Sequence, residues 1–458
     1  MSHALATAPA ATAVDLPSVV GADLQVPLVD GRCVRYANLD VAASAPALQA
    51  VADEVNALLP WYASVHRGAG YASQVCTRVL EAARTTVAEF VGARPGDVTV
   101  FTRHTTDSLN LLASCVPGPV LTLDVEHHAN LLPWQSRPGS RVIAARAGVD
   151  ATLAAVDDAL ARGSFALLAV TGASNVTGET LPIAQVVDIA HAYGTRVVVD
   201  AAQTAPHRRI DLAAWGADYV ALSGHKLYAP YGTGALVGRR DWLDEAAPHL
   251  AGGGAVAHVG IHGTTAEAAW APAPHRHEAG TPNVLGAAAL AAACRTLAPL
   301  LDEVAPAHER ALLTRLTDGL DAIDGVTSLR IWNDSPDRVA VASFVVDGVP
   351  AGLVAAYLSA EHGIGVRDGR FCAHPLLARL ADGGDGAGDG NAVRASLGLG
   401  STAEDVDRLL SALTALVAEG PRWDYAVVDG RWAPTPDPRD ADPLGLAGPV
   451  GTQRCGAA

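Results

Sequence analysis

The sequence has no run of lysine and arginine residues, although proteins that bind nucleic-acid backbones depend on clustered positive charge. Its 32 Lys and Arg residues are outnumbered by 48 Asp and Glu residues, which gives a formal net charge of −16. We therefore do not expect a nucleic-acid partner. The longest apolar stretches, such as 284–294, fall well short of the roughly 20 residues that a membrane-spanning helix needs. We therefore expect no membrane span.

Two further kinds of signal are missing. The N-terminal segment lacks the basic region and the continuous apolar region of a signal peptide, so the sequence predicts a cytoplasmic protein. The six cysteines are scattered, without a CxxC pair or the Cys and His spacing of a metal site. We predict neither disulfides nor a bound metal. These exclusions favour a globular protein whose 458 residues suffice for two or three domains.

Short runs of β-branched residues alternate with helical patterns along the first part of the chain. Most of these runs are apolar throughout, which is typical of strands covered by helices on both faces. The pattern predicts an α/β domain with a mainly parallel, seven-stranded central sheet. The predicted strands are 98–101, 120–123, 141–145, 165–170, 196–200, 219–222 and 235–237.

Changes in composition indicate the domain boundaries. Residues 1–22 are rich in Ala and Thr and are predicted to form a mobile arm. The large domain is predicted at 23–284, with about 25 residues at its start as candidates for packing on the small domain. A smaller α+β domain is predicted at 285–418. The Pro-rich tail, 419–458, is expected to wrap the surface or to be disordered, and 381–391 is too rich in Gly for a helix or strand.

The strongest chemical signal is the segment SGHKLYAPYGTG, which directly follows a predicted strand. A lysine at the end of a buried strand is shielded from water, which disfavours its charged form and leaves an amine able to form a Schiff base. Lysine is scarce in this sequence, so Lys226 in this apolar, Gly-flanked segment is a candidate nucleophile. The alternative is a solvated surface lysine.

Three other polar segments follow predicted strands. Asp200 ends one strand, with Gln203 three residues later, and a carboxylate there either holds a protonated ring nitrogen or caps a helix. The hydroxyls of Thr105 and Thr106 at a helix start predict an anion site suited to a phosphate. His127, in the segment EHHAN, is either structural or catalytic.

These segments place a lysine, a carboxylate, a phosphate cradle and an imidazole at the carboxyl edge of one sheet. Pyridoxal 5'-phosphate needs such a set: an amine for its aldehyde, an acid for its pyridine nitrogen, an anion site, and a planar group against its ring. The sequence therefore predicts a pyridoxal-phosphate enzyme.

The motifs and their order resemble the class V aminotransferase family of fold-type I pyridoxal-phosphate enzymes. Within it they are most similar to the group II, SufS-type, cysteine desulfurases and selenocysteine lyases, from about Tyr36 to about Gly400. The matching segments are HRG at 66–68, FTRHTTDSLN at 101–110, EHHANLLPWQ at 126–135, SNVTGE at 174–179, VDAAQ at 199–203, SGHKLYAPYGTG at 223–234, EAGTPN at 278–283, GVRDGRFCAHP at 365–375 and RASLGL at 394–399. The resemblance implies the fold-type I transferase fold and a homodimer with its active site near the subunit boundary.

The resemblance also implies a role for each matching residue. Lys226 is expected to form the Schiff base with the cofactor, Asp200 to pair with its pyridine nitrogen, and Gln203 to hydrogen-bond its phenolic oxygen. His127 is expected to stack on the ring and to move protons. The expected phosphate ligands are Thr105, Thr106, Ser223 and His225, with Thr281 from a second subunit. The expected substrate ligands are His66, Arg67, Asn175, Arg367 and Arg394, of which Asn175 and Arg394 bind the carboxylate.

Cys372 stands where these desulfurases carry the cysteine that forms a persulfide. Arg367 and Arg370 are close to it in the sequence, which favours the thiolate. The family typically has His before this cysteine, whereas this chain has Phe371. The resemblance predicts a cysteine desulfurase that takes sulfur from L-cysteine as a Cys372 persulfide, forms alanine, and passes the sulfur to a protein acceptor.

Three alternatives stay open at this point. A C–S or C–Se lyase acting on a modified cysteine or on selenocysteine needs Lys226 and Arg394 but not Cys372, and β-elimination gives pyruvate instead of alanine. A class V aminotransferase or an epimerase likewise needs no thiol at that position. A non-catalytic sulfur-relay or binding protein keeps the fold without the chemistry, and such a protein stays colourless in the presence of pyridoxal phosphate.

Overall fold

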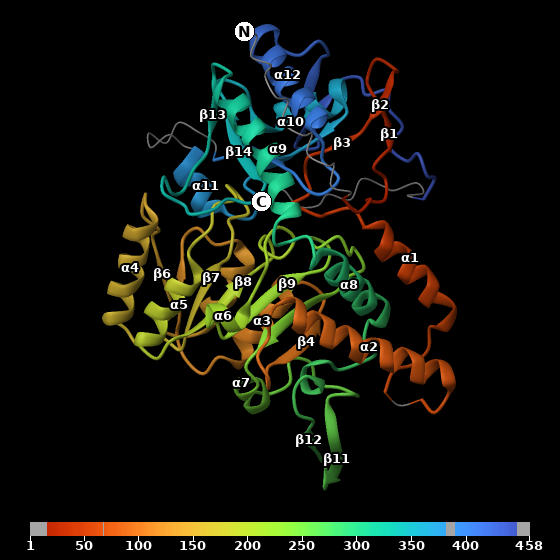
Figure 1. The fold of residues 1–458 in the computed structure, drawn as a ribbon, viewed down its shortest axis with the longest axis vertical. Helices are drawn as coiled ribbons and strands as arrows, with labels where there is room; N and C mark the ends of the chain where they lie inside the picture. The colour runs from red at the N-terminus through yellow and green to blue at the C-terminus, as the bar shows by residue number, and fades with distance from the viewer. Residues whose placement is uncertain (1–15, 67, 382–389, 447–458) are drawn as a thin grey trace, which may run out of the picture.

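The computed structural model describes residues 16–66, 68–381 and 390–446 and has a seven-stranded sheet at its centre (Figure 1). The strand order is β4-β10-β9-β8-β7-β5-β6, and only β10 runs antiparallel to its neighbours. The strands are β4 (Val98–Thr102), β5 (Val120–Leu123), β6 (Arg141–Ile143), β7 (Leu167–Thr171), β8 (Arg196–Asp200), β9 (Tyr219–Ser223) and β10 (Gly234–Gly238). The predicted α/β fold with a mainly parallel sheet is confirmed.

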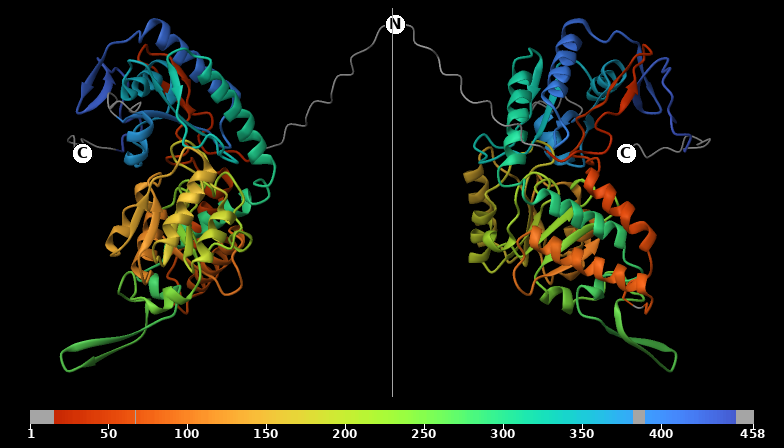
Figure 2. Two further views of the ribbon diagram at one scale, coloured as in Figure 1. Left: turned by 90° about the vertical axis from the view of Figure 1, so that its left-hand side faces the viewer. Right: turned by 45° about the vertical axis from the view of Figure 1, so that its right-hand side comes forward.

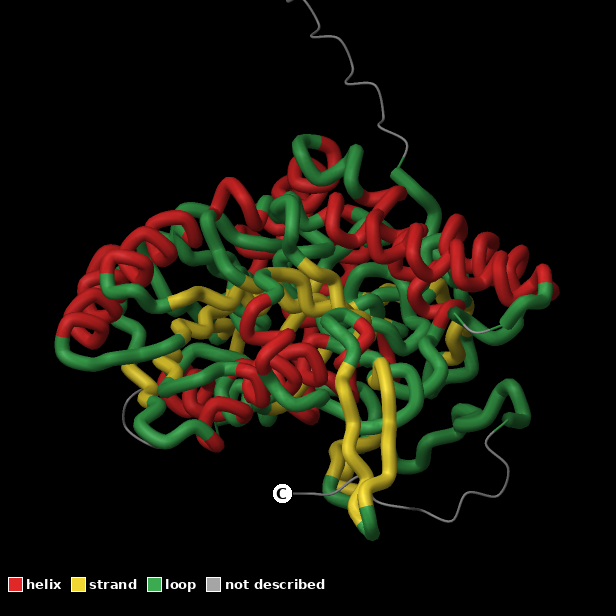
Figure 3. Tube along the Cα trace, turned by 90° about the horizontal axis from the view of Figure 1, so that it is seen from below, coloured by secondary structure: helices red, strands yellow, loops and turns green. Residues whose placement is uncertain are grey.

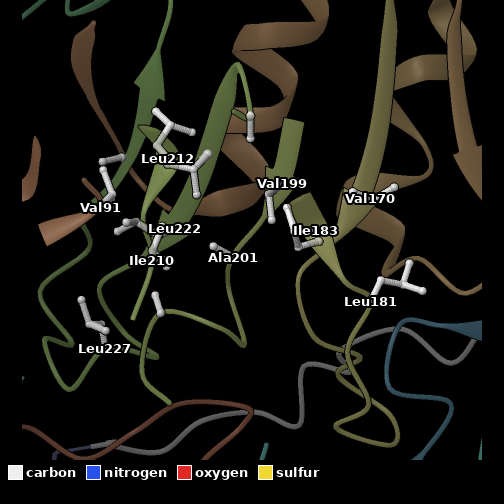
Figure 4. Packing of buried hydrophobic residues seen from close by; sticks show 14 of the residues in the cluster. Val91, Val170, Leu181, Ile183, Val199, Ala201, Ile210, Leu212, Leu222 and Leu227 are labelled. Atoms are coloured by element: carbon white, nitrogen blue, oxygen red, sulfur yellow. The ribbon is translucent and has the colours of Figure 1, made fainter. Parts of the chain in front are cut away.

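Both faces of this sheet are buried, which explains why its strands are apolar throughout. Leu168 and Val170 of β7 enter one core, part of which Figure 4 shows around Val199 and Leu222. The alternate residues Leu167 and Ala169 enter a second core on the other face. The first core includes α4 (Val149–Ala161), α5 (Ile183–Ala192) and α8 (Val284–Leu297), and the second includes α3 (Thr105–Cys115) and α7 (Asp241–Glu245).

The remaining helices of the large domain are α1 (Gln49–Leu58), α2 (Tyr71–Phe90) and the short α6 (Leu212–Trp215). The buried face of α2 packs along α8. A hairpin of β11 (Val256–His262) and β12 (Thr265–Trp270) projects from this domain (Figures 2 and 3). The sequence patterns did not predict this hairpin. Its side chains are mostly exposed, so they show no alternation between buried apolar and exposed polar residues.

The small domain is built on a four-stranded antiparallel sheet of order β13-β14-β17-β16. Its strands are β13 (Val326–Ser328), β14 (Val341–Val346), β16 (Arg367–Gly369) and β17 (Ala392–Ser396). Its helices are α9 (Val304–Asp321), α10 (Ala351–His362), α11 (His374–Ala381) and α12 (Ala403–Glu419). This sheet matters for function because its last two strands carry two of the predicted site arginines.

The N-terminal segment belongs to the small domain in space. It contains β1 (Gln25–Pro27), β2 (Cys33–Arg35) and β3 (Ala37–Asn38), and β3 pairs in parallel with β15 (Ile364–Gly365). Leu39 is fully buried in the small-domain core.

The arm predicted at 1–22 is fixed in the part that the structure describes, 16–22. Val19 is buried there, and Val20 N donates to Ala47 O at 2.7 Å. The side chain of Val19 is part of the large hydrophobic core. Residues 1–15 lie outside the described residues.

The described part of the Pro-rich tail wraps the surface, one of the two predicted outcomes. It forms a hairpin of β18 (Tyr425–Val428) and β19 (Arg431–Pro434) that packs on α10. Glu361 of α10 fastens the start of this hairpin by accepting from Trp423 N and Tyr425 Oη, both at 3.1 Å. Most of the predicted 381–391 loop lies outside the described residues.

The packing of the N-terminal segment can be tested by Leu39→Ala. Removing this fully buried side chain leaves a cavity and should lower the free energy of unfolding by about 2–5 kcal/mol. The matched control is Leu24→Ala in the same segment, where the leucine is 53% exposed, and we expect a much smaller effect. Urea unfolding followed by fluorescence measures both. Equal effects of the two substitutions would contradict this assignment.

Candidate active site

A cavity of about 260 Å³ lies where the carboxyl ends of the parallel strands meet the small domain. It is lined by loops that follow β4, β5, β7, β8 and β9 and by residues of β16, β17 and the turn after β16. Most of the predicted site residues line it together: Thr105, Thr106, His127, Asn175, Asp200, Gln203, Ser223, His225, Lys226, Arg367, Cys372 and Arg394. The clustering follows from the parallel sheet, because strands that run the same way end at the same edge.

Lys226 is the only lysine of the sequence, and its side chain faces the cavity. Burial lowers the pKa of its amine to about 8, the positive charge of Arg394 acts in the same direction, and the carboxylate of Asp200 acts against both. The neutral, nucleophilic amine is therefore well populated at slightly alkaline pH. This is not the environment of the solvated surface lysine that the sequence left as an alternative.

Asp200 and Gln203 lie at the end of β8 and are both buried. Burial raises the pKa of Asp200, whose carboxylate accepts from Ala202 N at 3.0 Å. Gln203 Nε2 donates to Ala42 O at 2.8 Å, while its Oε1 has no hydrogen-bond partner within the described chain. A buried carboxyl group and an amide with an unused hydrogen-bond acceptor can both bind a polar ligand in the cavity.

The predicted phosphate corner lies at the start of α3. Thr105 N donates to Ser223 Oγ at 2.7 Å, and the two hydroxyl oxygens lie 2.8 Å apart. These contacts join the start of α3 to the end of β9. Burial lowers the pKa of the adjacent His225 to about 4, so this imidazole is neutral near pH 7. Hydroxyls at the N-terminus of an 11-residue helix suit a phosphate.

His127 presents a neutral imidazole to the cavity. Its Nδ1 accepts from Ala129 N at 3.0 Å, so the ring proton lies on Nε2, and burial lowers its pKa to about 3. The preceding Glu126, to which we assigned no role from the sequence, is fully buried. It accepts from Asn130 Nδ2 at 2.7 Å and from Thr171 N at 3.0 Å, which fixes the segment that carries His127.

Arg367 and Arg394 are paired residues on the neighbouring strands β16 and β17. Two like charges opposite each other are unfavourable, and Asp40 lies between them, 3.1 Å from Arg394 Nη2 and 3.7 Å from Arg367 Nη1. Arg394 is buried, and its Nε has no hydrogen-bond partner within the described chain. This corner suits a carboxylate. Sequence reasoning missed Asp40 because only the tertiary structure brings it to the arginines.

Cys372 follows Phe371 in a left-handed turn at the edge of the cavity, with φ values of 53° and 47°. The turn is held from two sides: Asn175 Nδ2 donates to Phe371 O at 2.8 Å, and His128 N donates to Cys372 O at 2.8 Å. Cys372 is exposed, whereas the Phe371 ring is buried with its centre 5.2 Å from the Arg394 guanidinium. Neither hydrogen bond had a signal in the sequence.

Two predicted site residues do not line the Lys226 cavity of the same chain. His66 and Thr281 line a second, more open hollow of about 580 Å³. His66 Nε2 lies 2.9 Å from Glu81 Oε1 there. Arg67 lies outside the described residues.

The groups around the cavity fit pyridoxal 5'-phosphate, because each chemical part of the cofactor has a counterpart: an amine, a buried acid, an amide with spare capacity, a phosphate corner and an imidazole. Among residues 16–66, 68–381 and 390–446, no three His, Cys, Asp or Glu side chains are grouped so that they could hold a metal ion. No helix in those ranges is long and apolar enough to cross a membrane.

Comparisons with known proteins agree with this geometry. The family model "Aminotransferase class-V" matches residues 37–409. A probable cysteine desulfurase of Pseudomonas aeruginosa is 41% identical over 387 residues, covering 82% of this chain and 92% of the relative. A cysteine desulfurase of Klebsiella pneumoniae is 36% identical, covering 84% and 94%.

Solved structures give the same result. The apo cysteine desulfurase of Thermococcus onnurineus NA1 is 32% identical with a TM-score of 0.75, covering 83% of this chain and 94% of that one. The cysteine desulfurase CsdA of Escherichia coli, in an S-sulfonic acid form, is 33% identical with a TM-score of 0.71, covering 82% and 94%. The chain belongs to the class V aminotransferase family, whose enzymes depend on pyridoxal phosphate.

Proposed function

We propose that the protein is a cysteine desulfurase that transfers the sulfur of L-cysteine to Cys372 and releases alanine. The observation that carries this proposal is an exposed thiol at the edge of the cavity that also holds Lys226 and Arg394. Burial lowers the pKa of both Lys226 and Arg394, and a negative charge at Cys372 would act in the opposite direction on each, so the thiol lies within their electrostatic reach. The family membership and the named relatives support the same activity.

The proposed cofactor contacts follow the predicted ones. When bound, pyridoxal phosphate supplies an electron sink for the bonds at the substrate Cα. Asp200 and Gln203 would hold its ring, Lys226 its aldehyde carbon, and the start of α3 its phosphate. The residues proposed for the phosphate are Thr105, Thr106, Ser223 and His225.

The chain's own residues bind the substrate and move its protons. Arg394, through its unpartnered Nε, and Asn175 bind the substrate carboxylate. Arg367 adds a second positive charge to this corner. The neutral amine of Lys226 accepts the Cα proton. His127 carries its proton on Nε2 and donates it within the cavity.

The sulfur transfer needs no external oxidant or reductant. The Cys372 thiolate attacks the sulfur of the bound cysteine, an S–S bond forms, and the C–S bond breaks with its electron pair passing to the substrate side. The former Cβ gains a proton, Cα regains the proton that Lys226 removed, alanine leaves, and Cys372 retains the transferred sulfur as a persulfide. One carbon is reduced while two sulfurs are oxidised, so the step balances.

Phe371 favours a second candidate, a C–S or C–Se lyase. A buried apolar ring stands beside Arg394 where the resembling desulfurases have His. A lyase that eliminates its leaving group makes no use of a thiol, and its product is pyruvate. Aminotransferase and epimerase reactions would give Cys372 no role. A non-catalytic protein would give no role to any of the groups that line the cavity.

We further propose a homodimer, a protein acceptor for the sulfur, and residence in the cytoplasm. The homodimer is supported by His66 and Thr281, which lie away from the Lys226 cavity of their own chain and remain available to a second subunit. The exposed Tyr62 lies on the same connection as His66, and the exposed Tyr71 begins α2 directly after it. The cytoplasm is supported by the free cysteines of the described chain, because Cys372 must stay reduced.

The low pKa of Lys226 can be measured directly in the apoprotein. The rate of reductive methylation at Lys226 should rise with pH through a midpoint near 8, because the neutral amine is the reactive form. Peptide mapping separates this site from the N-terminal amine, and no other lysine interferes. A midpoint near the ordinary 10.5 would show that the amine is solvated.

The role of Cys372 is tested by Cys372→Ala. We expect the variant to keep the cofactor absorbance but to form alanine from L-cysteine roughly a hundredfold more slowly, because the sulfur has no acceptor. The matched control is Cys33→Ala, which removes another exposed thiol far along the chain and should retain the wild-type rate. Wild-type turnover by Cys372→Ala rejects the desulfurase, and pyruvate as the product supports the lyase.

The homodimer predicts a solution mass near twice the chain mass of 46.8 kDa. Light scattering after size exclusion measures this mass. A charge at Tyr71, which is 72% exposed at the start of α2, should shift the population toward monomer in Tyr71→Asp. Val427→Asp on the C-terminal hairpin, where the valine is 58% exposed, is the control and should stay dimeric. A wild-type mass of one chain rejects the dimer.

A further inference from the structure

One side chain connects the carboxylate corner of the cavity with the turn that carries the thiol. Asn175 is buried, and its backbone O accepts from Arg394 Nη1 at 2.9 Å. Its amide Nδ2 donates to Phe371 O at 2.8 Å, directly before Cys372. The Arg394 guanidinium also lies against the Phe371 ring. Arg394, Asn175 and Phe371 therefore contact one another pairwise and form a closed set beside the thiol.

We propose that Asn175 is a positioning residue for the Cys372 nucleophile, in addition to any contact with the substrate carboxylate. This inference rests on the proposed desulfurase function and deepens it. The amide nitrogen of Asn175 carries two N–H groups. One is used by the Phe371 carbonyl, and the second remains for the substrate. A single planar amide then sets the distance between the substrate carboxylate and the thiol turn.

The turn needs such a fastening because of its backbone conformation. Phe371 and Cys372 are consecutive residues with φ of 47° and 53°, a region that side-chain-bearing residues rarely adopt. Such a conformation is strained and persists only where neighbouring groups hold it. His128 N holds the Cys372 carbonyl from the outer side, and Asn175 Nδ2 holds the Phe371 carbonyl from the inner side. Loss of the inner bond frees the turn to move away from the cavity.

The direction of the effect follows from the chemistry of sulfur transfer. Attack on the substrate sulfur requires the thiolate to lie in line with the breaking C–S bond, and small errors in placement lower the rate strongly. Steps before the attack, at the substrate Cα, do not involve Cys372. An Asn175 variant should therefore lose the sulfur-transfer step more than the earlier steps.

Two substrates separate these effects. L-cysteine needs the thiol, whereas β-chloro-L-alanine presents the same carboxylate and loses chloride by elimination, giving pyruvate, ammonia and chloride without a sulfur nucleophile. For Asn175→Ala, we expect kcat for alanine formation from saturating cysteine to fall roughly tenfold or more beyond any fall in kcat for chloroalanine, because only the cysteine reaction also needs the placed thiol. KM should rise for both substrates, because each carboxylate loses the same contact.

Arg394→Lys weakens the carboxylate contact and should raise KM for both substrates. Asn175→Asp is a second variant of nearly the same volume that has no donor for the Phe371 carbonyl. It should show the same difference in kcat between the two substrates. Equal losses of kcat for cysteine and chloroalanine in both Asn175 variants would overturn the proposal and leave Asn175 as a substrate ligand only.

A readout without turnover completes the test. The rate at which iodoacetamide alkylates Cys372 in the apoprotein, followed by peptide mass spectrometry, should differ from wild type at least threefold in Asn175→Ala because the turn is released. An unchanged rate counts against the proposal. Failure of the desulfurase function itself looks different, since Cys372→Ala then turns over cysteine at the wild-type rate whatever Asn175 does.

Discussion

The removal of one amine from water is the constraint on which the site depends. Lys226 lies at the end of a buried strand, and burial brings its pKa to about 8. Asp200, which is buried at the neighbouring strand end, opposes this shift, and Arg394 reinforces it. The negative charge of Asp200 thus opposes burial and the positive charge of Arg394, so that the amine is neither fixed as a cation nor wholly neutral. A lysine with an ordinary pKa would be almost entirely protonated near neutral pH and could not act as a nucleophile or a base.

This balance is possible because the cavity is made by two domains. The parallel sheet brings acid, amine, imidazole and hydroxyls to one edge. The small domain closes that edge with a strand pair that presents Arg367 and Arg394. Asp40, which comes from the N-terminal segment packed on the small domain, offsets their mutual repulsion. Positive charge is therefore concentrated where an amino-acid carboxylate would bind, at a distance from the phosphate corner at the start of α3.

The sequence predicted the fold and the site best where the residue types and the hydrophobic periodicity of a segment indicate the same structure. The seven central strands could be predicted because burial on both faces leaves continuous apolar runs, and Lys226 and Asp200 could be singled out because they end such runs. The sequence could not predict the roles of Asp40 and Glu126 or the two hydrogen bonds that hold the Cys372 turn. Each of these contacts depends on a partner far away in the chain. The β11–β12 hairpin escaped prediction for a different reason, since its side chains are mostly exposed and leave no periodic signal.

Phe371 stands where the resemblance leads us to expect histidine, and its contacts in this structure show what the phenyl ring does there. A histidine at this position would bring a titratable group next to Arg394, whereas the phenyl ring brings a face that attracts the guanidinium and excludes water. The ring is buried, and its own carbonyl is the group that Asn175 holds. Phe371 therefore has a packing role here, and in the proposed mechanism proton movement is left to Lys226 and to His127. The thiol keeps its place because the turn is fastened at both carbonyls, without help from a charged neighbour at position 371.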